Sequence, residues 1–434
     1  MVLMSGSVAA RPVGESGIPA LKNAAFSIIK SIAVGKLPEG PVYDAANGNI
    51  YVPNEDSSSV SVISSATNKV TATIPVTHTE PGSVLTGAVL DPWARELFVV
   101  DENNFGNVSI INTTNDKLTA TVPLNIGFPI YPYYNPYNRE VYVISQELGI
   151  AVIATPTNKE TALPVCPGNR THVAFVTPLG LYLDNATHDF VTDCPTTGAI
   201  SIINSVTNAV TTLYLPKGNH PDFQVYDPTN KDMYIVDTGG EFNLFNRSAN
   251  VTVLGPSNTI VATVATTGAL GTNPTYDPSN HEIYVMGLTF NKTLGPDPSV
   301  LTVLSNTSKV VSKITVGFGA EIATYDPANT ELYVPSLKTN TTDVINGTTN
   351  KVVSTLVSHG DPYVAVYDPS NHYIGILGYL SSTEISTLTV YSSANKLVTT
   401  LTHTGDFSSG FVYDPSNADF YASDPKLDTV VVFH

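Results

Sequence analysis

Hydrophobic and polar residues alternate in short runs along most of this 434-residue chain. Val, Ile, Thr and Tyr dominate the runs, and clusters of Asn, Asp, Pro, Gly and Ser separate them. β-branched and aromatic residues at a period of two suit pleated strands, and the separating residues are those that tight turns need. The pattern therefore predicts an all-β chain built from consecutive hairpins.

One phrase, Tyr-Asp-Pro-x-Asn followed by a strand ending in Tyr-Val, recurs roughly every 40 to 50 residues. Its copies begin at Tyr43, Leu90, Tyr134, Tyr226, Tyr276, Tyr325, Tyr367 and Tyr413, and a degenerate copy begins at Phe175. The Pro presets the backbone of a turn, and the Asp and Asn side chains bond to backbone groups. We therefore expect these Asp residues to shape turns rather than to catalyse.

A second phrase follows most copies of the first and reads as a hairpin with a Thr-Asn-Lys turn. It begins at Val60, Val108, Ile200, Val251, Leu301, Thr342 and Leu388. The two phrases together supply four strands per repeat. Four-stranded units of this length, repeated many times, are typical of a β-propeller, because no blade buries both of its faces alone.

The Tyr-Val strand ends and the phrase V-x-V-I-x-x-x-T-N-K-V-x-A-T-I-P-V resemble the YVTN-repeat family of β-propellers, including surface-layer-type and YncE-like proteins. The resemblance covers roughly residues 24–434 and implies one propeller domain there. Residues 1–23 are then an N-terminal extension. Within it, Val8-Ala9-Ala10 looks like the end of a signal peptide, and an unstructured start is the alternative.

The last copy ends at Thr429–His434, one strand short of a blade. Residues 26–35, FSIIKSIAVG, match the final strand of a repeat and precede the first complete copy. We therefore predict that the N-terminal segment completes the C-terminal blade and removes two open sheet edges. This count gives nine blades, or eight if the degenerate fourth copy is not a full blade.

The charge composition argues against nucleic acid as a partner. Lys and Arg number 20 against 37 Asp and Glu, which gives a net charge of -17, and no basic run is present to track phosphates. The sequence also contains no apolar stretch long enough for a membrane span. Phosphate-binding, dinucleotide, zinc-protease and nucleophile-elbow motifs are absent, so we assign no catalytic or cofactor-binding residue.

Candidate chemistry gathers in the loops that lead into each innermost strand, which we expect at one mouth of the central channel. Five of the nine histidines fall there: His78, His172, His220, His359 and His403. Carboxylates share these loops: Asp222, Glu321 and Asp361, together with Glu39, Glu80 and Asp406. Converging imidazoles and carboxylates suit a divalent metal or an acid–base pair. The alternative is that they are ordinary exposed loop residues. His188, His281 and His372 lie elsewhere and support no mechanism.

The two cysteines and the glycosylation sequons bear on localisation. Cys166 and Cys194 both belong to the fourth repeat, each in a loop at the same mouth, and we predict a disulfide between them if the protein is exported. Sequons occur at Asn107, Asn112, Asn169, Asn185, Asn246, Asn250, Asn291, Asn306, Asn340 and Asn346. These features favour an extracellular or cell-surface glycoprotein. By analogy, the scarcity of Lys resembles surface proteins of acidophilic archaea.

The tyrosines at one repeat position are expected to pack between blades: Tyr51, Tyr142, Tyr234, Tyr284 and Tyr333. The cluster YPYYNPYN from Tyr131 is aromatic enough to suggest a patch for a sugar or a protein partner. We expect a non-catalytic propeller that binds or assembles with surface proteins or glycans. The alternatives are a lactonase-like or redox enzyme and a metal-binding protein, both with a His/carboxylate site at the channel mouth.

Overall fold

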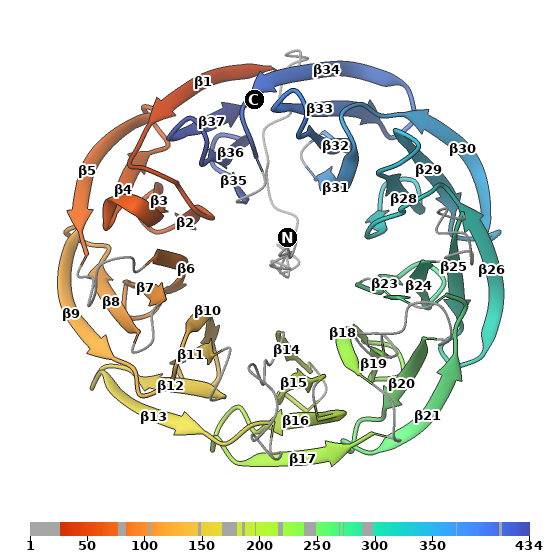
Figure 1. Cartoon of the computed structure of the whole chain (residues 1–434), viewed down its shortest axis with the longest axis horizontal. Coiled ribbons are helices and arrows are strands. Elements are labelled where there is room, and N and C mark those ends of the chain that lie inside the picture. Colours follow the sequence, from red (N-terminus) through yellow and green to blue (C-terminus); the bar gives the residue numbers. More distant parts are fainter. Residues whose placement is uncertain are drawn as a thin grey trace.

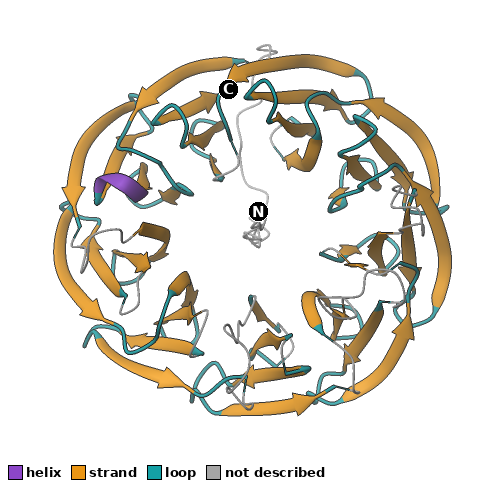
Figure 2. Ribbon diagram, viewed as in Figure 1, coloured by secondary structure: helices purple, strands orange, loops and turns teal. Residues whose placement is uncertain are grey.

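The computed structural model of the chain is a closed ring of nine β-sheets around a central axis (Figure 1). The structure describes residues 27–76, 84–102, 106–145, 149–166, 180–184, 187–195, 197–215, 220–237, 249–268, 270–271, 273–288, 298–369, 371–407 and 410–434. The predicted extension over residues 1–23, with its signal-like Val8–Ala10, lies outside these residues. Strands dominate the described part, and the helical element in it is the short 3-10 turn η1 (Glu55–Ser57) (Figure 2).

Each blade is an antiparallel sheet, and in blades 1 to 8 the strands run in sequence order from the channel to the rim. Blade 1 contains β2 (Val42–Asp44), β3 (Asn49–Asn54), β4 (Ser59–Ser64) and β5 (Lys69–Pro75). Blade 2 contains β6 (Val84–Asp91), β7 (Glu96–Glu102), β8 (Asn107–Asn112) and β9 (Lys117–Pro123). Blade 3 contains β10 (Pro129–Asn135), β11 (Glu140–Ser145), β12 (Ile150–Ala154) and β13 (Lys159–Leu163).

The next three blades follow the same plan. Blade 4 contains β14 (Leu181–Leu183), β15 (Phe190–Cys194), β16 (Ala199–Ile203) and β17 (Val210–Tyr214). Blade 5 contains β18 (Pro221–Asp227), β19 (Asp232–Asp237), β20 (Asn250–Leu254) and β21 (Ile260–Ala265). In blade 6 the innermost strand is split into β22 (Leu270–Gly271) and β23 (Thr275–Asp277), followed by β24 (Glu282–Leu288), β25 (Ser299–Leu304) and β26 (Val310–Val316).

The last three blades complete the ring. Blade 7 contains β27 (Thr324–Asp326), β28 (Glu331–Ser336), β29 (Thr341–Asn346) and β30 (Lys351–Val357). Blade 8 contains β31 (Pro362–Asp368), β32 (Tyr373–Leu380), β33 (Ile385–Ser392) and β34 (Leu397–Thr404). Blade 9 contains β35 (Phe411–Asp414), β36 (Asp419–Asp424), β37 (Thr429–Phe433) and, as its outermost strand, β1 (Ile28–Ala33).

The predicted ring closure is confirmed. Strand β1 pairs antiparallel with β37, with Ile32 opposite Val430 and Ile28 opposite Phe433. The backbones of Ser27 and His434 extend the pairing through two hydrogen bonds of 3.0 Å. The fourth repeat forms a full four-stranded blade, so the nine-blade count is confirmed and the eight-blade alternative is wrong.

The register expected for the degenerate fourth copy is wrong. Leu181–Leu183 forms the innermost strand of blade 4, and the turn Asp of this copy is Asp184. The segment expected to be one long loop contains the buried strand β15, so Cys194 ends a strand instead of lying in a loop. His188 lies in the tight turn before β15, with φ 61°. The missing Pro and Tyr of the motif explain why the sequence pattern misplaced this copy.

Two faces of the ring carry different connections. We call the connection between the innermost and second strands the inner turn, and that between the third and outermost strands the outer turn; both lie on one face. The inter-blade loops, which lead into each innermost strand, and the middle loops, which join the second and third strands, lie on the opposite face, the mouth. In blade 1, for example, Pro38 of the inter-blade loop bridges Asn54 at the start of the middle loop.

Apolar clusters fill the spaces between neighbouring blades. Between blades 9 and 1, for instance, Ile32, Val430 and Val432 pack against Ile50 and Val52, and all five are buried. Outermost strands expose alternate residues, as in β5, because one side of the rim faces solvent. The hydrophobic alternation in the sequence thus becomes a series of sheet-on-sheet contacts, each shared by two blades.

A polar clasp links the inner turn of one blade to the outer turn of the next. In blade 1, Asn47 Nδ2 donates to the Thr113 carbonyl oxygen at 2.8 Å, and the Tyr51 hydroxyl donates to Asp116 Oδ1 at 2.7 Å. The clasp of the last blade runs from the Tyr421 hydroxyl to Asn68 Oδ1 at 2.7 Å and closes the ring. The same tyrosine bond recurs for Tyr142 with Asn208, Tyr284 with Asn350 and Tyr333 with Asn395. The tyrosines therefore pack between blades, as predicted, and also join them by hydrogen bonds.

Candidate functional site

The inter-blade and middle loops form one mouth, as expected from the repeat. In blade 1 the Gly35 backbone N–H donates to Asn54 Oδ1 at 3.1 Å, and in blade 9 the Asp406 N–H donates to Asp424 Oδ1 at 3.1 Å. A polar residue at the end of the second strand thus holds the loop that leads into the innermost strand of the same blade. Because this contact holds the backbone of the loop, it limits the directions that the loop's side chains can take at the mouth.

The described mouth histidines belong to two blades. His220 precedes β18 of blade 5, whereas His359 and His403 both belong to blade 8. The predicted loop position of His403 is wrong, because this residue lies in the outermost strand β34. His403 Nε2 lies 2.7 Å from Asp424 Oδ2, and its ring stacks on Phe407 with 4.9 Å between centroids. His359 is exposed, and its carbonyl oxygen accepts a bond from Thr387 Oγ1 at 2.6 Å. His220 is half-buried before β18. His78, His172 and Glu80 lie outside the described residues.

The predicted carboxylates also belong to different blades. Glu321 is half-buried before β27, and burial raises the pKa of its carboxyl to about 7. Asp222 lies on β18 and Asp361 precedes β31, where its backbone N–H donates to Asn340 Oδ1 at 2.9 Å. Over the residues placed by the structure, no group of three or more His, Cys, Asp or Glu is arranged to hold a metal ion. The divalent-metal site stays a prediction that involves the undescribed loops.

Acidic side chains cluster at the mouth of blades 1 and 2. Burial, and then the charge of Glu55, raise the pKa of Glu39 to about 7. Burial followed by charge repulsion also raises the pKa values of Glu55, beside Asp56, and of Glu102, beside Glu55. Of these three glutamates, the sequence predicted only Glu39 as a residue of the mouth. A sequence feature that could have pointed to Glu55 and Glu102 is an acidic pair at or directly after the end of the second strand in two consecutive repeats. These pairs are Glu55-Asp56 and Asp101-Glu102.

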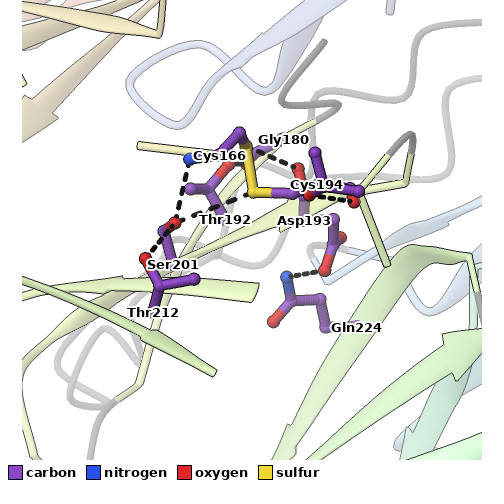
Figure 3. Close-up of a disulfide and its surroundings, with 9 residues drawn as sticks. Cys166, Gly180, Thr192, Asp193, Cys194, Ser201, Thr212 and Gln224 are labelled. Atoms are coloured by element: carbon purple, nitrogen blue, oxygen red, sulfur yellow. Dashed lines mark hydrogen bonds between the residues drawn. A yellow bond between two sulfur atoms is a disulfide. The ribbon is translucent and has the colours of Figure 1, made fainter. Parts of the chain in front are cut away.

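A second group of buried carboxyls lies at blades 4 and 5, beside the disulfide (Figure 3). Asp193 is fully buried, and its Oδ1 accepts a bond from Gln224 Nε2 at 2.8 Å. Burial, followed by the charges of Asp222 and Asp237, raises the pKa of Asp193 well above its usual range. Burial also raises the pKa of Asp237 to about 7. These groups can retain protons at a pH where exposed carboxyls are ionised.

The predicted disulfide is confirmed. Cys166 and Cys194 are joined, with 5.2 Å between their Cα atoms, and both are buried. The Cys166 backbone N–H donates to Ser201 Oγ at 3.1 Å, and Figure 3 shows the bridge beside Ser201. The bond ties the loop after β13 to the end of β15, so it holds blade 4, the least regular repeat, against blade 3.

The sequons differ in accessibility. Asn107 is fully buried and its Nδ2 donates to Asp101 Oδ2 at 3.1 Å, so this fold does not accommodate a glycan there. Asn306 and Asn340 are exposed, whereas Asn112, Asn250 and Asn346 are partly exposed. The sequons at Asn169, Asn185, Asn246 and Asn291 lie outside the described residues. Glycosylation of the remaining sites stays a prediction.

The aromatic cluster of the third repeat divides between core and surface. Tyr131 and Tyr133 pack toward blade 4, and Tyr134 packs toward blade 2. Tyr137, in the inner turn, is 40 % exposed and stacks on His188. The predicted partner-binding patch therefore consists of the turn end of the cluster, on the face opposite the mouth.

The seam between blades 8 and 9 lacks the repeat's tyrosine. Gly375 takes its position on β32, and blade 9 has no outer turn to receive a hydroxyl, because the chain ends meet there. The space left behind is an apolar cavity of approximately 50 Å³ lined by residues that include Tyr373, Leu388, Phe411 and Phe433. A tyrosine at this position of blade 8 would have no outer turn of blade 9 to bond to.

Comparison with known proteins supports the β-propeller fold but shows no closer relationship. No family model and no curated protein matches this chain. Among solved structures, the Dos1 propeller is 11% identical with a TM-score of 0.57, and 94% of each chain is covered. The C-terminal WD40 domain of Sif2 is 10% identical with a TM-score of 0.55, covering 94% of this chain and 97% of that one.

An enzyme also shares the architecture. The dihydro-heme d1 dehydrogenase NirN, solved in complex with DHE, is 13% identical with a TM-score of 0.56, covering 86% of this chain and 78% of that one. At these identities the similarity establishes a WD40-like β-propeller and nothing about activity. Within the described residues, no helix is long and apolar enough to cross a membrane.

Proposed function

We propose that this chain is a non-catalytic extracellular propeller of the YVTN-repeat type that acts as a binding or assembly module. The observation that carries the proposal is how the mouth side chains are used. His403 is paired with Asp424 and stacked on Phe407, and the other described candidates are spread over blades 1, 5, 7, 8 and 9. Propellers with rigid blades and variable loops commonly mediate interactions between proteins.

The disulfide supports an extracellular location. A buried disulfide forms and persists in oxidising compartments, and here it stabilises the blade whose sequence departs furthest from the repeat. The two exposed sequons agree with export, and the low Lys and Arg content resembles surface proteins of acidic habitats. Both arguments concern the compartment and are independent of the ligand.

The test combines metal analysis with activity on intact purified protein. We expect no stoichiometric transition metal, no hydrolysis of a lactone panel, and no free thiol in protein exported to an oxidising compartment. A stoichiometric metal that is lost in a His220→Ala, His359→Ala variant, with the fold retained by circular dichroism, would overturn the binding-module proposal. His281→Ala is the matched control, because His281 lies on the face opposite the mouth.

A further inference from the structure

Four exposed side chains gather on the inner turns of blades 2, 3 and 4, which are neighbours in the ring (Figure 1). Trp93 lies in the turn between β6 and β7, Tyr137 and Arg139 lie in the turn between β10 and β11, and His188 lies in the turn between β14 and β15. We call this set the aromatic–cationic platform. It lies on the face opposite the mouth, so it is separate from the site discussed above.

The platform consists of two stacked pairs, each of which spans two blades. The Arg139 guanidinium carbon lies 5.0 Å from the centroid of the Trp93 ring. The rings of Tyr137 and His188 stack with 4.6 Å between centroids and 14° between planes. Since both pairs include a residue of the blade 3 turn, the four side chains form one continuous surface.

The backbone under the platform is fixed before any ligand arrives. The Trp93 N–H donates to the buried Asp91 Oδ1 at 2.9 Å, and the Tyr137 N–H donates to the buried Asn135 Oδ1 at 2.9 Å. Both acceptors stand at the Asp position of the repeat motif. Because the turns that hold Trp93 and Tyr137 are already ordered, a ligand binding to these two side chains loses little conformational entropy.

The side chains of the platform are accessible and have free polar groups. Trp93 is 69% exposed and Tyr137 is 40% exposed, and Arg139 and His188 are also exposed. Within the part of the chain that the structure describes, no hydrogen bond or ion pair occupies the Arg139 guanidinium, the His188 ring or the Tyr137 hydroxyl. An aromatic surface with unused donors beside it suits a ligand that is rich in acceptors.

Equivalent turns elsewhere in the ring use their basic residues differently. In blade 6 the His281 Nδ1 bonds to the Tyr276 hydroxyl at 2.8 Å, and in blade 2 the Arg95 guanidinium pairs with Asp44 at 3.3 Å. The same position of the turn therefore holds a satisfied side chain in those blades. Free donors at this turn position therefore do not follow from the repeat itself. Blade 5 also exposes one at Lys231, but in blades 3 and 4 the donors lie beside stacked aromatic rings.

We propose that the platform binds an acidic saccharide, a chain of pyranose rings that carry carboxylates. The exposed faces of Trp93 and Tyr137 can stack on the apolar C–H faces of the sugar rings, and Arg139 can take a carboxylate in a bidentate pair. In the described inner turns, the exposed large apolar side chains are these two aromatics. Two aromatic side chains, at roughly 150 to 250 Å² each, offer less apolar surface than the roughly 800 Å² per partner of a standard protein interface, which favours a saccharide. This inference rests on the proposed binding function and names its ligand class.

The experiment uses the fact that Trp93 is the only tryptophan of the chain, so intrinsic fluorescence reports on the platform directly. Full-length protein is titrated with polygalacturonate and, as a neutral polymer, with dextran at physiological salt. We expect a saturable change in emission with polygalacturonate and a much weaker response to dextran. Arg139→Ala should raise the Kd for polygalacturonate about tenfold, the usual effect of losing a charged hydrogen bond. His281→Ala, at the same turn position in blade 6, should leave the Kd unchanged.

Three outcomes would overturn the proposal. The first is the absence of a saturable response to polygalacturonate, and the second is equal binding of dextran and polygalacturonate that Arg139→Ala does not alter. The third is self-association in sedimentation that Trp93→Phe abolishes, which would assign the platform to a second copy of the chain. None of these results depends on metal content or turnover, so each leaves the proposed function standing. Catalytic turnover would remove the proposed function without affecting the platform titration.

Discussion

Stability should fall as the pH rises from 5 to 8, because the protein buries carboxyl groups that prefer to be neutral. Burial raises the pKa of Asp237 from 3.8 to about 7 and that of Glu321 from 4.5 to about 7. Burial and the neighbouring Glu55 raise the pKa of Glu39 to the same range. In the unfolded chain these carboxyls regain their ordinary values.

The sign follows from proton binding. Between about pH 4 and 7 the folded state holds protons on these carboxyls that the unfolded state has released, so the free energy of unfolding decreases as the pH rises. The stabilisation is fully present below the unfolded pKa values and is lost as the pH passes through the folded value near 7. This direction is opposite to that of a carboxyl held in a salt bridge.

Asp237 sets the scale, because it is fully buried. A shift from 3.8 to about 7 corresponds to at most about 4 kcal/mol of lost stability, since one unit is worth about 1.4 kcal/mol. The two pH units between 5 and the folded value near 7 account for about 3 kcal/mol of this loss. For 434 residues the entropy of unfolding near 60 °C is about 0.9 kcal/mol/K, so Tm should fall by about 3 °C between pH 5 and 8. Glu39 and Glu321 are half-buried, and solvent screening makes their contributions smaller.

The assay is differential scanning calorimetry at half-unit steps from pH 5 to 8, with urea unfolding at the two extremes. Asp237→Asn should raise Tm at pH 8 and flatten the pH dependence, because the amide removes the buried charge and can still accept the bond from Thr252 Oγ1. Glu384→Gln, on the exposed surface pair with Lys426, serves as the control, because it changes the net charge in the same direction as Asp237→Asn. The reasoning is refuted if wild-type Tm rises with pH, or if Asp237→Asn follows the wild-type curve.

Three further perturbations test the architecture. Replacing Cys166 and Cys194 by Ser should lower the free energy of unfolding by about 3 to 4 kcal/mol in urea titrations. The reason is that the bridge closes a loop with a sequence separation of 28. Unchanged stability would contradict this role of the disulfide. Tyr421→Phe removes the hydroxyl bonded to Asn68 and should cost about 1 to 2 kcal/mol by the same assay, whereas a neutral substitution would mean that apolar packing alone closes the ring. Deleting residues 1–33 uncovers the edge of β37, so we expect the variant to aggregate, as measured by size-exclusion chromatography. A stable monomer would show that ring closure does not need β1.

Local patterns predicted the architecture because the repeat is written in short sequence phrases. Alternating β-branched residues specified the strands, the Asp-Pro-x-Asn and Thr-Asn-Lys segments specified the turns, and the leftover strand at residues 26–35 specified the closure. Each of these signals spans fewer residues than one blade. Where the phrase degenerates, at residues 175–184, the prediction of register failed for the same reason.

The tertiary structure alone decided what crosses between blades. Tyr51 and Asp116 are 65 residues apart, and the platform joins Trp93 to Arg139 and Tyr137 to His188 across turns of three blades. The repeat pattern does not show which turns of neighbouring blades lie beside each other. The sequence therefore drew attention to the histidines of the mouth, whereas the unpaired donors of the platform lie on the opposite face. The repeat determines what each blade is, and the closing of the ring determines which side chains of neighbouring blades meet, because contacts between blades depend on geometry that no single phrase contains.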